Sequence, residues 1–346
     1  YFTEPGVKPG DEQEIAMDDA LISLLDGSKQ TIDIAIYDLN DELITEALVN
    51  AHERGIRVRM VGDADEEDDW GYQELKDAGI GQVLRETSGI MHNKFIVVDQ
   101  RVVWTGSTNL TFNGLYRNNN DALLLDSKPL ANEYTIEFEQ MYVDAEFGAK
   151  KEDENGFNAV PFNNSDLEFY FSPQHDPVQV MESLIAEADH SALFMLFSFT
   201  HPVLTEALTS ALNDGIKVAG ILDEGQTRPW YSQDEALAEA DIPLYLDGNR
   251  NAMGFSGGKL HHKALIIDAG TLSDPFVVTG SFNWSKSGDT RNDENIVVIR
   301  DPAIVNAYKQ RWCALRAQAS VHPSYKGKET HICSPSDQIK MRSNEF

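Results

Sequence analysis

The sequence is poor in cysteine. Of 346 residues only Cys313 and Cys333 are cysteines, and both lie near the C-terminal end. They allow a single disulfide, which would fix the C-terminal tail and suit an exported protein, or they could be two unrelated thiols. The chain opens at Tyr1 without an initiator methionine, as after removal of a leader or shortening of the chain. We expect a secreted or periplasmic protein.

Long apolar runs are also missing. No run of apolar residues approaches the length that a membrane-spanning helix needs. The hydrophobic fraction of 41% is that of a globular protein, and the length is sufficient for two domains, each with its own core.

Basic residues are scarce. Lys and Arg number 28 against 57 Asp and Glu, which gives a formal net charge of −29. Such acidity keeps a protein soluble and disfavours non-specific adhesion to nucleic acid or anionic lipid, but it does not exclude a local basic groove. A solvated surface suited to salty or cold surroundings explains the charge without a functional role.

Against this background one stretch carries most of the chemistry. It is HNKFIVVDQRVVWTGSTN, and its recurring polar positions are His92, Lys94, Asp99, Gly106, Ser107 and Asn109. Residues two apart on an extended segment share a face, so the imidazole of His92 and the ammonium of Lys94 point the same way. Lysine holds anionic oxygens and histidine can attack or move a proton, so the pair is suited to a phosphoryl group.

The same stretch occurs a second time, 169 residues later. The second copy has the corresponding positions His261, Lys263, Asp268, Gly280, Ser281 and Asn283. The similarity extends further, since Tyr1-Phe2-Thr3 answers Tyr170-Phe171-Ser172 and Arg117-Asn118 answers Arg291-Asn292. The chain is therefore a tandem duplication.

Each repeat alternates predicted strands and helices. Apolar periodicity predicts helices over 11–25, 41–54, 131–142 and 303–315, and strands over 31–39, 56–61, 95–98, 102–105, 264–267 and 276–279. This order is typical of an α/β fold with a largely parallel sheet. We predict a first repeat at 1–147, a linker at 148–168, a second repeat at 169–316 and a tail at 317–346.

The pattern H-x-K-x4-D-x6-G-S-x-N resembles the signature of the phospholipase D superfamily, and the resemblance extends over roughly residues 1 to 316. It implies two tandem phospholipase D-like repeats, each a mostly parallel mixed sheet flanked by helices, related by a pseudo-twofold axis. It further implies that His92 and His261 meet at one site, where one forms a phosphohistidine and the other protonates the leaving oxygen.

Family usage assigns the nucleophile to His92 and the general acid to His261. Four side chains would hold the non-bridging oxygens, Lys94, Lys263, Asn109 and Asn283, and no metal or other cofactor is expected because the lysines supply the positive charge. A monomer suffices, since both repeats lie in one chain.

The repeats differ at one position of the family pattern. The glutamate that orients a histidine is present as Glu294 in RNDEN, whereas the matching position of the first repeat is Asn120. A carboxylate partner raises the basicity of an imidazole and fixes its tautomer. The sequence leaves open which histidine Glu294 contacts.

Other residues have plainer interpretations beside a functional one. Asp99 and Asp268 favour a turn, Ser107 and Ser281 could bind phosphate or satisfy the turn, and His262 is expected to be structural. Trp70 and Trp230 occupy equivalent places, where core packing is the plainer interpretation and stacking on bases or contact with acyl chains the functional one.

Substrate identity divides into three hypotheses. We favour a nuclease on DNA or RNA because GSFNWSKSGDTRNDEN is similar to the nuclease branch, with phosphate contacts offered by Arg85, Arg117, Arg228, Arg250 and Arg291. The chain's acidity argues against this, because duplex binders display a basic footprint. The alternative is a phospholipase D that releases a head group, with the loop 248–258 as a mobile lip. An inactive binding module is disfavoured, since both His-Lys pairs are intact.

Overall fold

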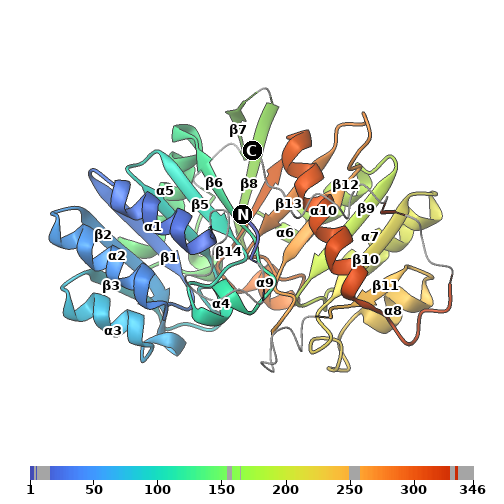
Figure 1. The fold of residues 1–346 in the computed structure, drawn as a ribbon, viewed down its shortest axis with the longest axis horizontal. Helices are drawn as coiled ribbons and strands as arrows, with labels where there is room; N and C mark the ends of the chain where they lie inside the picture. The colour runs from blue at the N-terminus through green and yellow to red at the C-terminus, as the bar shows by residue number, and fades with distance from the viewer. Residues whose placement is uncertain are drawn as a thin grey trace.

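The computed structural model describes residues 1–3, 5, 16–153, 158–163, 165–248, 258–327 and 332–333. It is a mixed α/β structure in which the two halves of the chain lie side by side, the first blue to green and the second yellow to red (Figure 1). This confirms the predicted fold class. Residues 11–15 of the first predicted helix, residues 249–257 of the predicted lip and Arg250 lie outside the described residues.

The first half builds a six-stranded sheet in the order β3-β2-β1-β4-β5-β6. Its elements are α1 (Met17–Gly27), β1 (Thr31–Ile36), α2 (Glu42–Glu53), β2 (Arg57–Asp63), the short 3-10 helix η1 (Ala64–Glu66), α3 (Trp70–Asp77), β3 (Gly81–Arg85), β4 (Lys94–Val98), β5 (Val102–Gly106), α4 (Phe112–Tyr116), β6 (Ala122–Asp126) and α5 (Lys128–Tyr142).

The second half builds a nine-stranded sheet in the order β15-β11-β10-β9-β12-β13-β14-β8-β7. Its elements are the 3-10 helix η2 (Gly148–Lys150), β7 (Ala159–Phe162), β8 (Ser165–Ser172), α6 (Pro177–Ala186), β9 (Ser191–Leu196), α7 (Pro202–Asn213), β10 (Lys217–Leu222), α8 (Asp234–Glu239), β11 (Leu244–Leu246), β12 (Lys263–Ile267), β13 (Phe276–Gly280), α9 (Lys286–Thr290), β14 (Glu294–Ile299), α10 (Pro302–Gln318) and β15 (Ser320–Val321). None of the described helices is long and apolar enough to cross a membrane.

Parallel pairing is less common than the sequence predicted. Strands β1, β2 and β3 pair in parallel, as do β9, β10 and β11. In the first sheet the other three pairs, β1 with β4, β4 with β5 and β5 with β6, are antiparallel. The prediction of mostly parallel sheets was therefore wrong. Strands β4 and β5 are joined by a turn of three residues, and so short a connection requires antiparallel neighbours.

The stretch predicted as a linker also carries regular structure. Strand β7 and the start of β8 fall within 148–168, and β8 pairs with β14 on the sheet of the second half. The match between Tyr1-Phe2-Thr3 and Tyr170-Phe171-Ser172 is structural too, because Phe2 bridges Asp121 as Phe171 pairs with Asn295. The boundaries of the two repeats stay a prediction.

The two halves share one apolar core. It draws side chains from both sheets and from α5 and α10, among them Phe95, Tyr134, Val277 and Trp312. A separate core under α1, α2 and α3 covers the outer face of the first sheet, and another under α6, α7 and α8 covers that of the second. The shared core packs the two halves together, so the strands of one sheet are held in a fixed position relative to those of the other.

Two aspartates fix the ends of the motif strands that lie away from the histidines. Asp99 has a φ of 53° and its carboxylate accepts hydrogen bonds from the backbone N–H groups of Lys29, Gln30 and Thr31. Asp268 has the same φ and accepts from Asp189, His190 and Ser191. The predicted turn role of both aspartates is confirmed.

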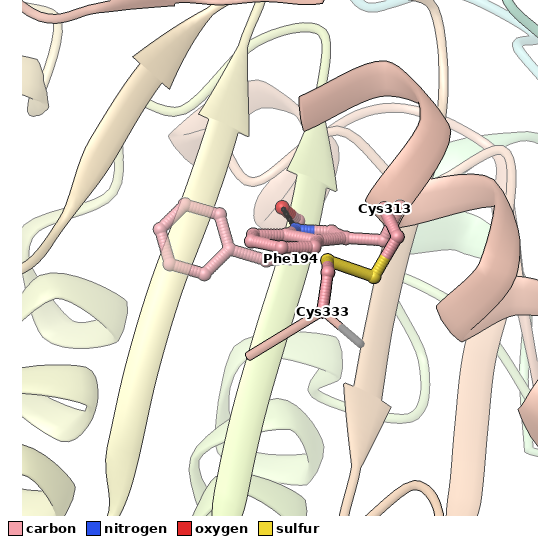
Figure 2. The surroundings of a disulfide bond; sticks show 4 residues. Phe194, Cys313 and Cys333 are labelled. Carbon is pink, nitrogen blue, oxygen red and sulfur yellow. Dashed lines mark hydrogen bonds between the residues drawn. A yellow bond between two sulfur atoms is a disulfide. The ribbon is translucent and has the colours of Figure 1, made fainter. Parts of the chain in front are cut away.

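The two cysteines form a disulfide. Cys313 lies in α10 and Cys333 in the tail, with 5.7 Å between their Cα atoms (Figure 2). Figure 2 shows the bond beside Phe194 of β9, whose backbone oxygen accepts a hydrogen bond from Trp312 Nε1 at 3.1 Å. The disulfide therefore holds the described end of the tail against the shared core, and the alternative of two unrelated thiols is excluded.

Candidate active site

The two histidines enter one site from opposite halves. The backbone N–H of His92 donates to the backbone oxygen of Asp293 at 2.9 Å, and that of His261 donates to Asn119 at 2.8 Å. Each histidine segment thus forms a parallel bridge with the segment that follows the Gly-Ser-x-Asn turn of the other half. This exchange places the start of β4 next to the start of β12, as the predicted pseudo-twofold arrangement requires.

His92 is bound by a carboxylate from the second half. Its Nδ1 lies 2.7 Å from Oε2 of Glu294, and the Glu294 side chain is fully buried. Asn292 Nδ2 donates to the other carboxylate oxygen at 3.2 Å. Because an ionised carboxylate only accepts, Nδ1 carries the proton and Nε2 is the atom that faces a reactant. The question that the sequence left open is answered, since Glu294 contacts His92.

His261 is bound by an amide from the first half. Its Nδ1 lies 2.9 Å from Oδ1 of Asn120 and 3.1 Å from the backbone oxygen of Ser107. Asn120 Nδ2 donates to the backbone oxygen of Gly114 at 2.8 Å, which fixes the amide with its oxygen toward the ring. Both imidazoles therefore present Nε2, but only His92 has a charged partner.

The two lysines lie beneath the histidines and point at the same site. Lys94 Nζ donates to the backbone oxygen of His92 at 2.8 Å, and Lys263 Nζ donates to that of His261 at 2.7 Å. Each ammonium also lies over an aromatic ring, Tyr37 in the first half and Phe197 in the second. One backbone acceptor uses one of three N–H groups, so each lysine retains donors for an anion.

Burial shifts the protonation of all four groups. It lowers the pKa of His92 to about 4, against the opposing effect of Glu294, and lowers the pKa of His261 well below its usual value, with the charges of Lys263 and Lys94 adding to the effect. Burial also lowers the pKa of Lys94 to about 7 and that of Lys263 well below its ordinary value. Burial therefore disfavours the charged forms of these four groups, and a bound anion would favour them again.

The asparagines and serines of the two turns have different surroundings. The side-chain oxygens of Asn109 and Asn283 are buried without a hydrogen-bond partner among the described residues. Ser107 Oγ and Ser281 Oγ instead accept from the backbone N–H groups of Asp121 and Asn295, at 3.0 and 2.9 Å. The serines thus satisfy the turns, whereas the asparagines could bind substrate oxygens only through Nδ2, because their side-chain oxygens accept and do not donate.

His262 has the structural surroundings that its strand position predicted. It is fully buried, and its Nδ1 lies 2.7 Å from Oδ1 of Asp121. Although burial alone would raise it, the pKa of Asp121 is held well below its usual range by hydrogen bonds from His262, Thr279 and Tyr308. In the second half, Asn295 occupies the position equivalent to Asp121, and its Nδ2 donates hydrogen bonds to Thr105 and Tyr134. Sequence reasoning did not single out this buried network.

Sequence reasoning also missed an acidic rim beside Lys94. It consists of Asp38, Glu66 and Asp69, each with a carboxylate oxygen within 4.8 Å of the others, a spacing that could hold a cation. Burial, a hydrogen bond with Asp69 and its charge raise the pKa of Asp38 to about 7. The Tyr37 ring lies next to this rim and contacts the His92 ring edge-on, with centroids 5.5 Å apart. A second group with this spacing, outside the site of His92 and His261, consists of Asp234, Glu235 and His322.

Three sequence predictions about the site need correction. Arg85 is buried and donates to Asp293 and to the backbone oxygen of Arg291, so its guanidinium is not available to a substrate phosphate. Trp70 is 45% exposed and Trp230 is 93% exposed, so core packing is wrong for both. Each loop leaves its sheet at an aspartate turn, and local sequence does not reveal how much of each ring the rest of the chain covers.

The family model described as "Cardiolipin synthase, PLD-like domain" matches residues 21–142 and 181–315, one segment in each half. The chain belongs to the phospholipase D superfamily. It is a hydrolase of this superfamily, with phosphodiesterase activity.

Relatives named for lipid chemistry and a nuclease-type relative both match, the latter being the solved phospholipase D family member Nuc of Salmonella typhimurium, 29% identical with a TM-score of 0.40, which covers 45% of this chain and 97% of its own. A phospholipase D of Rickettsia felis is 34% identical over 161 residues, which are 46% of this chain and 74% of the relative. A mitochondrial cardiolipin hydrolase of Xenopus laevis is 33% identical over 124 residues, 35% of this chain and 59% of the relative. The solved phosphatidylserine synthase of Haemophilus influenzae Rd KW20 has a TM-score of 0.66 at 15% identity and covers 90% of this chain and 87% of its own, a likeness of fold.

Proposed function

We propose that the chain hydrolyses phosphodiesters through a covalent phosphohistidine on His92, with His261 as the general acid. The observation that carries this assignment is the unequal partnering of the two rings, Glu294 on His92 and Asn120 on His261. A phosphorylated imidazole is a cation, and the carboxylate of Glu294 stabilises that charge. The neutral amide leaves His261 the stronger acid, as a proton donor to the leaving oxygen should be.

The reaction then has two displacements at phosphorus. Nε2 of His92 attacks, the bond to the leaving oxygen breaks, and the proton on Nε2 of His261 passes to that oxygen. In the second step His261 takes a proton from water, whose oxygen attacks phosphorus while the bond to His92 breaks. Lys94, Lys263 and the two turn asparagines stabilise the charge on the non-bridging oxygens throughout, so the proposed chemistry needs no metal.

For the substrate we propose the head-group ester of a phospholipid, in place of the nuclease favoured from sequence. Support comes from the acidic rim beside Lys94, because a polyanionic strand crossing it would meet Asp38, Glu66 and Asp69. A cationic head group such as choline would instead find carboxylates and the Tyr37 ring next to the reacting phosphorus. The names of two curated relatives, a phospholipase D and a cardiolipin hydrolase, agree with a lipid substrate.

A nuclease remains the second candidate. The observation that favours it is the likeness of residues 280–295 to the nuclease branch, together with exposed basic side chains at Arg228 and Arg291. Single-stranded nucleic acid would suit these few cations better than a duplex, which needs an extended basic footprint.

One experiment separates the two substrates. The protein is incubated in EDTA with phosphatidylcholine below its aggregation threshold or with single-stranded DNA, and choline release and strand cleavage are measured. We expect choline release in EDTA, abolished in His92→Ala. Cleavage of DNA without choline release would overturn the lipid assignment, and full activity in His92→Ala would overturn the proposed mechanism.

We also propose that the protein acts outside the cytoplasm and as a monomer. The disulfide between Cys313 and Cys333 supports export, because such bonds persist in oxidising compartments. Both histidines and all their partners come from one chain, which supports a site that is complete without a second subunit. Sedimentation of the oxidised protein tests the second point, since a dimer at micromolar concentration would contradict it.

A further inference from the structure

Exposed aromatic side chains gather at one edge of the molecule. Among the described residues, the exposed aromatics are Tyr1, Trp70, Phe112, Trp230 and Tyr231. All but Tyr1 lie in loops or at helix starts, and each of these segments follows a strand that ends at the same edge of its sheet. We call these four residues, Trp70, Phe112, Trp230 and Tyr231, the aromatic rim.

Strand register places the aromatic rim at the edge that carries the histidines. The last residue of β1, Ile36, pairs with Lys94, and β2, which leads toward Trp70, runs parallel to β1. The last residue of β9, Leu196, pairs with both Lys263 and Leu222, so β10 ends there too and leads to Trp230 and Tyr231. Strand β5 runs antiparallel to β4, so the chain that leaves it toward Phe112 also emerges at this edge.

The rings of Trp230 and Tyr231 differ in how much of each is exposed to solvent. Trp230 is 93% exposed and Tyr231 53%, and each contacts the other edge-on with centroids 5.7 Å apart. An indole held almost wholly in water has no role in folding and exposes roughly 200 Å² of apolar surface. Two exposed rings from the second half and two from the first lie at the edge that carries the histidines, so a flat apolar surface could contact both halves at once.

We propose that the aromatic rim seats the catalytic edge on a zwitterionic phospholipid surface. This inference rests on the proposed function and adds how the enzyme meets its substrate. Tryptophan and tyrosine favour the boundary between head groups and acyl chains, because an apolar ring and a polar N–H or O–H are satisfied there together.

Charge selects the kind of surface. The loop before Trp70 carries six acidic residues within positions 63–69, and only Arg228 is basic between Asp223 and Trp230. Carboxylates repel anionic lipid and nucleic acid alike, whereas the outward ammonium groups of phosphatidylcholine attract them. The same charges argue against base stacking as the role of the rings, since each base brings a phosphate.

The test measures partition into phosphatidylcholine vesicles, with phosphatidylglycerol vesicles and single-stranded DNA as the other probes. Binding is followed by vesicle flotation and by the blue shift of tryptophan emission, in a His92→Ala background that prevents turnover. The variant is Trp230→Ala with Tyr231→Ala, and Trp70→Ala tests the other half. Leu272→Ala is the matched control, because Leu272 is fully exposed in the β12–β13 turn at the opposite edge.

We expect the double variant to weaken vesicle binding by about tenfold or more and Trp70→Ala to weaken it less, in line with interfacial burial of their rings. Leu272→Ala should bind as the parent does, and phosphatidylglycerol vesicles should bind more weakly than phosphatidylcholine. Unchanged binding by the double variant with native circular dichroism would overturn the proposal. So would preferential binding of DNA that is lost in the double variant, which would assign the rings to base stacking.

The proposed function can fail separately. Hydrolysis of the soluble diester bis(p-nitrophenyl) phosphate by the unmodified chain reports the chemistry without any vesicle. Vesicle binding that depends on the rings, without such hydrolysis, would leave the aromatic rim standing and remove the phosphodiesterase site. Hydrolysis without vesicle binding would do the reverse.

Discussion

Glu294 and Asn120 occupy equivalent positions in the two halves, yet they give the two histidines different chemistry. One ring is held by a carboxylate at 2.7 Å and the other by an amide oxygen at 2.9 Å. The geometry is nearly the same, so the difference is one of charge. In the proposed mechanism this difference in charge makes one copy of the histidine the nucleophile and the other the acid.

Replacing Glu294 by Gln should therefore lower kcat by roughly a hundredfold, within the range that a positioned acid–base partner contributes. Gln keeps the shape and an acceptor for Nδ1 but removes the charge that stabilises the phosphohistidine cation. Steady-state turnover of a soluble diester measures the effect. Glu46→Gln on the exposed side of α2 is the control and should be unchanged; a loss below threefold in Glu294→Gln would contradict the assigned role.

The protonation states predict an acidic optimum for kcat/KM. His92 must be unprotonated to attack, and its pKa of about 4 keeps it so in mildly acidic solution. His261 must be protonated, and its lowered pKa makes activity fall as pH rises. The optimum should lie below pH 6.5, the usual pKa of histidine.

Asn120→Asp supplies the discriminating variant. A negative charge beside Nδ1 raises the pKa of His261, so the alkaline limb of the profile should move to higher pH. A pH profile of kcat/KM measures this. An unmoved alkaline limb in Asn120→Asp would mean that His261 is not the acid.

Among the elements, the motif hairpins depend on their turn aspartates. Asp99→Ala removes three hydrogen bonds to backbone N–H groups, and Asp268→Ala removes the equivalent three. We expect each to lower the free energy of unfolding by roughly 2–3 kcal/mol. Because these turns lie at the strand ends away from the histidines, kcat of the folded protein should stay within twofold, as urea unfolding and turnover would show. A large fall in kcat without loss of stability would make the aspartates catalytic.

These elements also show what the sequence could predict. The motif strands, the turn aspartates and the correspondence of Tyr1-Phe2-Thr3 with Tyr170-Phe171-Ser172 follow from local patterns repeated twice, and all three are found. Local patterns could not predict whether the side chains of Trp70, Trp230 and Arg85 are buried or exposed. Burial of these side chains depends on which distant segment covers them, and Arg85 is covered by Asp293, 208 residues away. The contact of Glu294 with His92 depends in the same way on the second half crossing to the first.

For the whole molecule, the disulfide is the one covalent cross-link between the tail and the body in the described chain. It closes a loop of 20 residues in sequence separation, for which chain entropy predicts about 3 kcal/mol of stabilisation. Cys333→Ser should lower the free energy of unfolding by roughly that amount and leave turnover unchanged. Chemical denaturation with and without reductant measures it. Equal stability of the oxidised protein and the variant would show that the tail adds nothing to the fold.

Each half supplies the side chain that binds the other half's histidine, and the proposed mechanism requires the two histidines to have different roles. The most direct test is to locate the phosphoryl group. A soluble diester is mixed with the His261→Ala variant, the reaction is quenched in alkali to preserve phosphohistidine, and peptides are mapped by mass spectrometry. We expect the phosphoryl group on the peptide that contains His92. A phosphoryl group on the His261 peptide of the unmodified chain, with none on His92, would contradict the proposed mechanism.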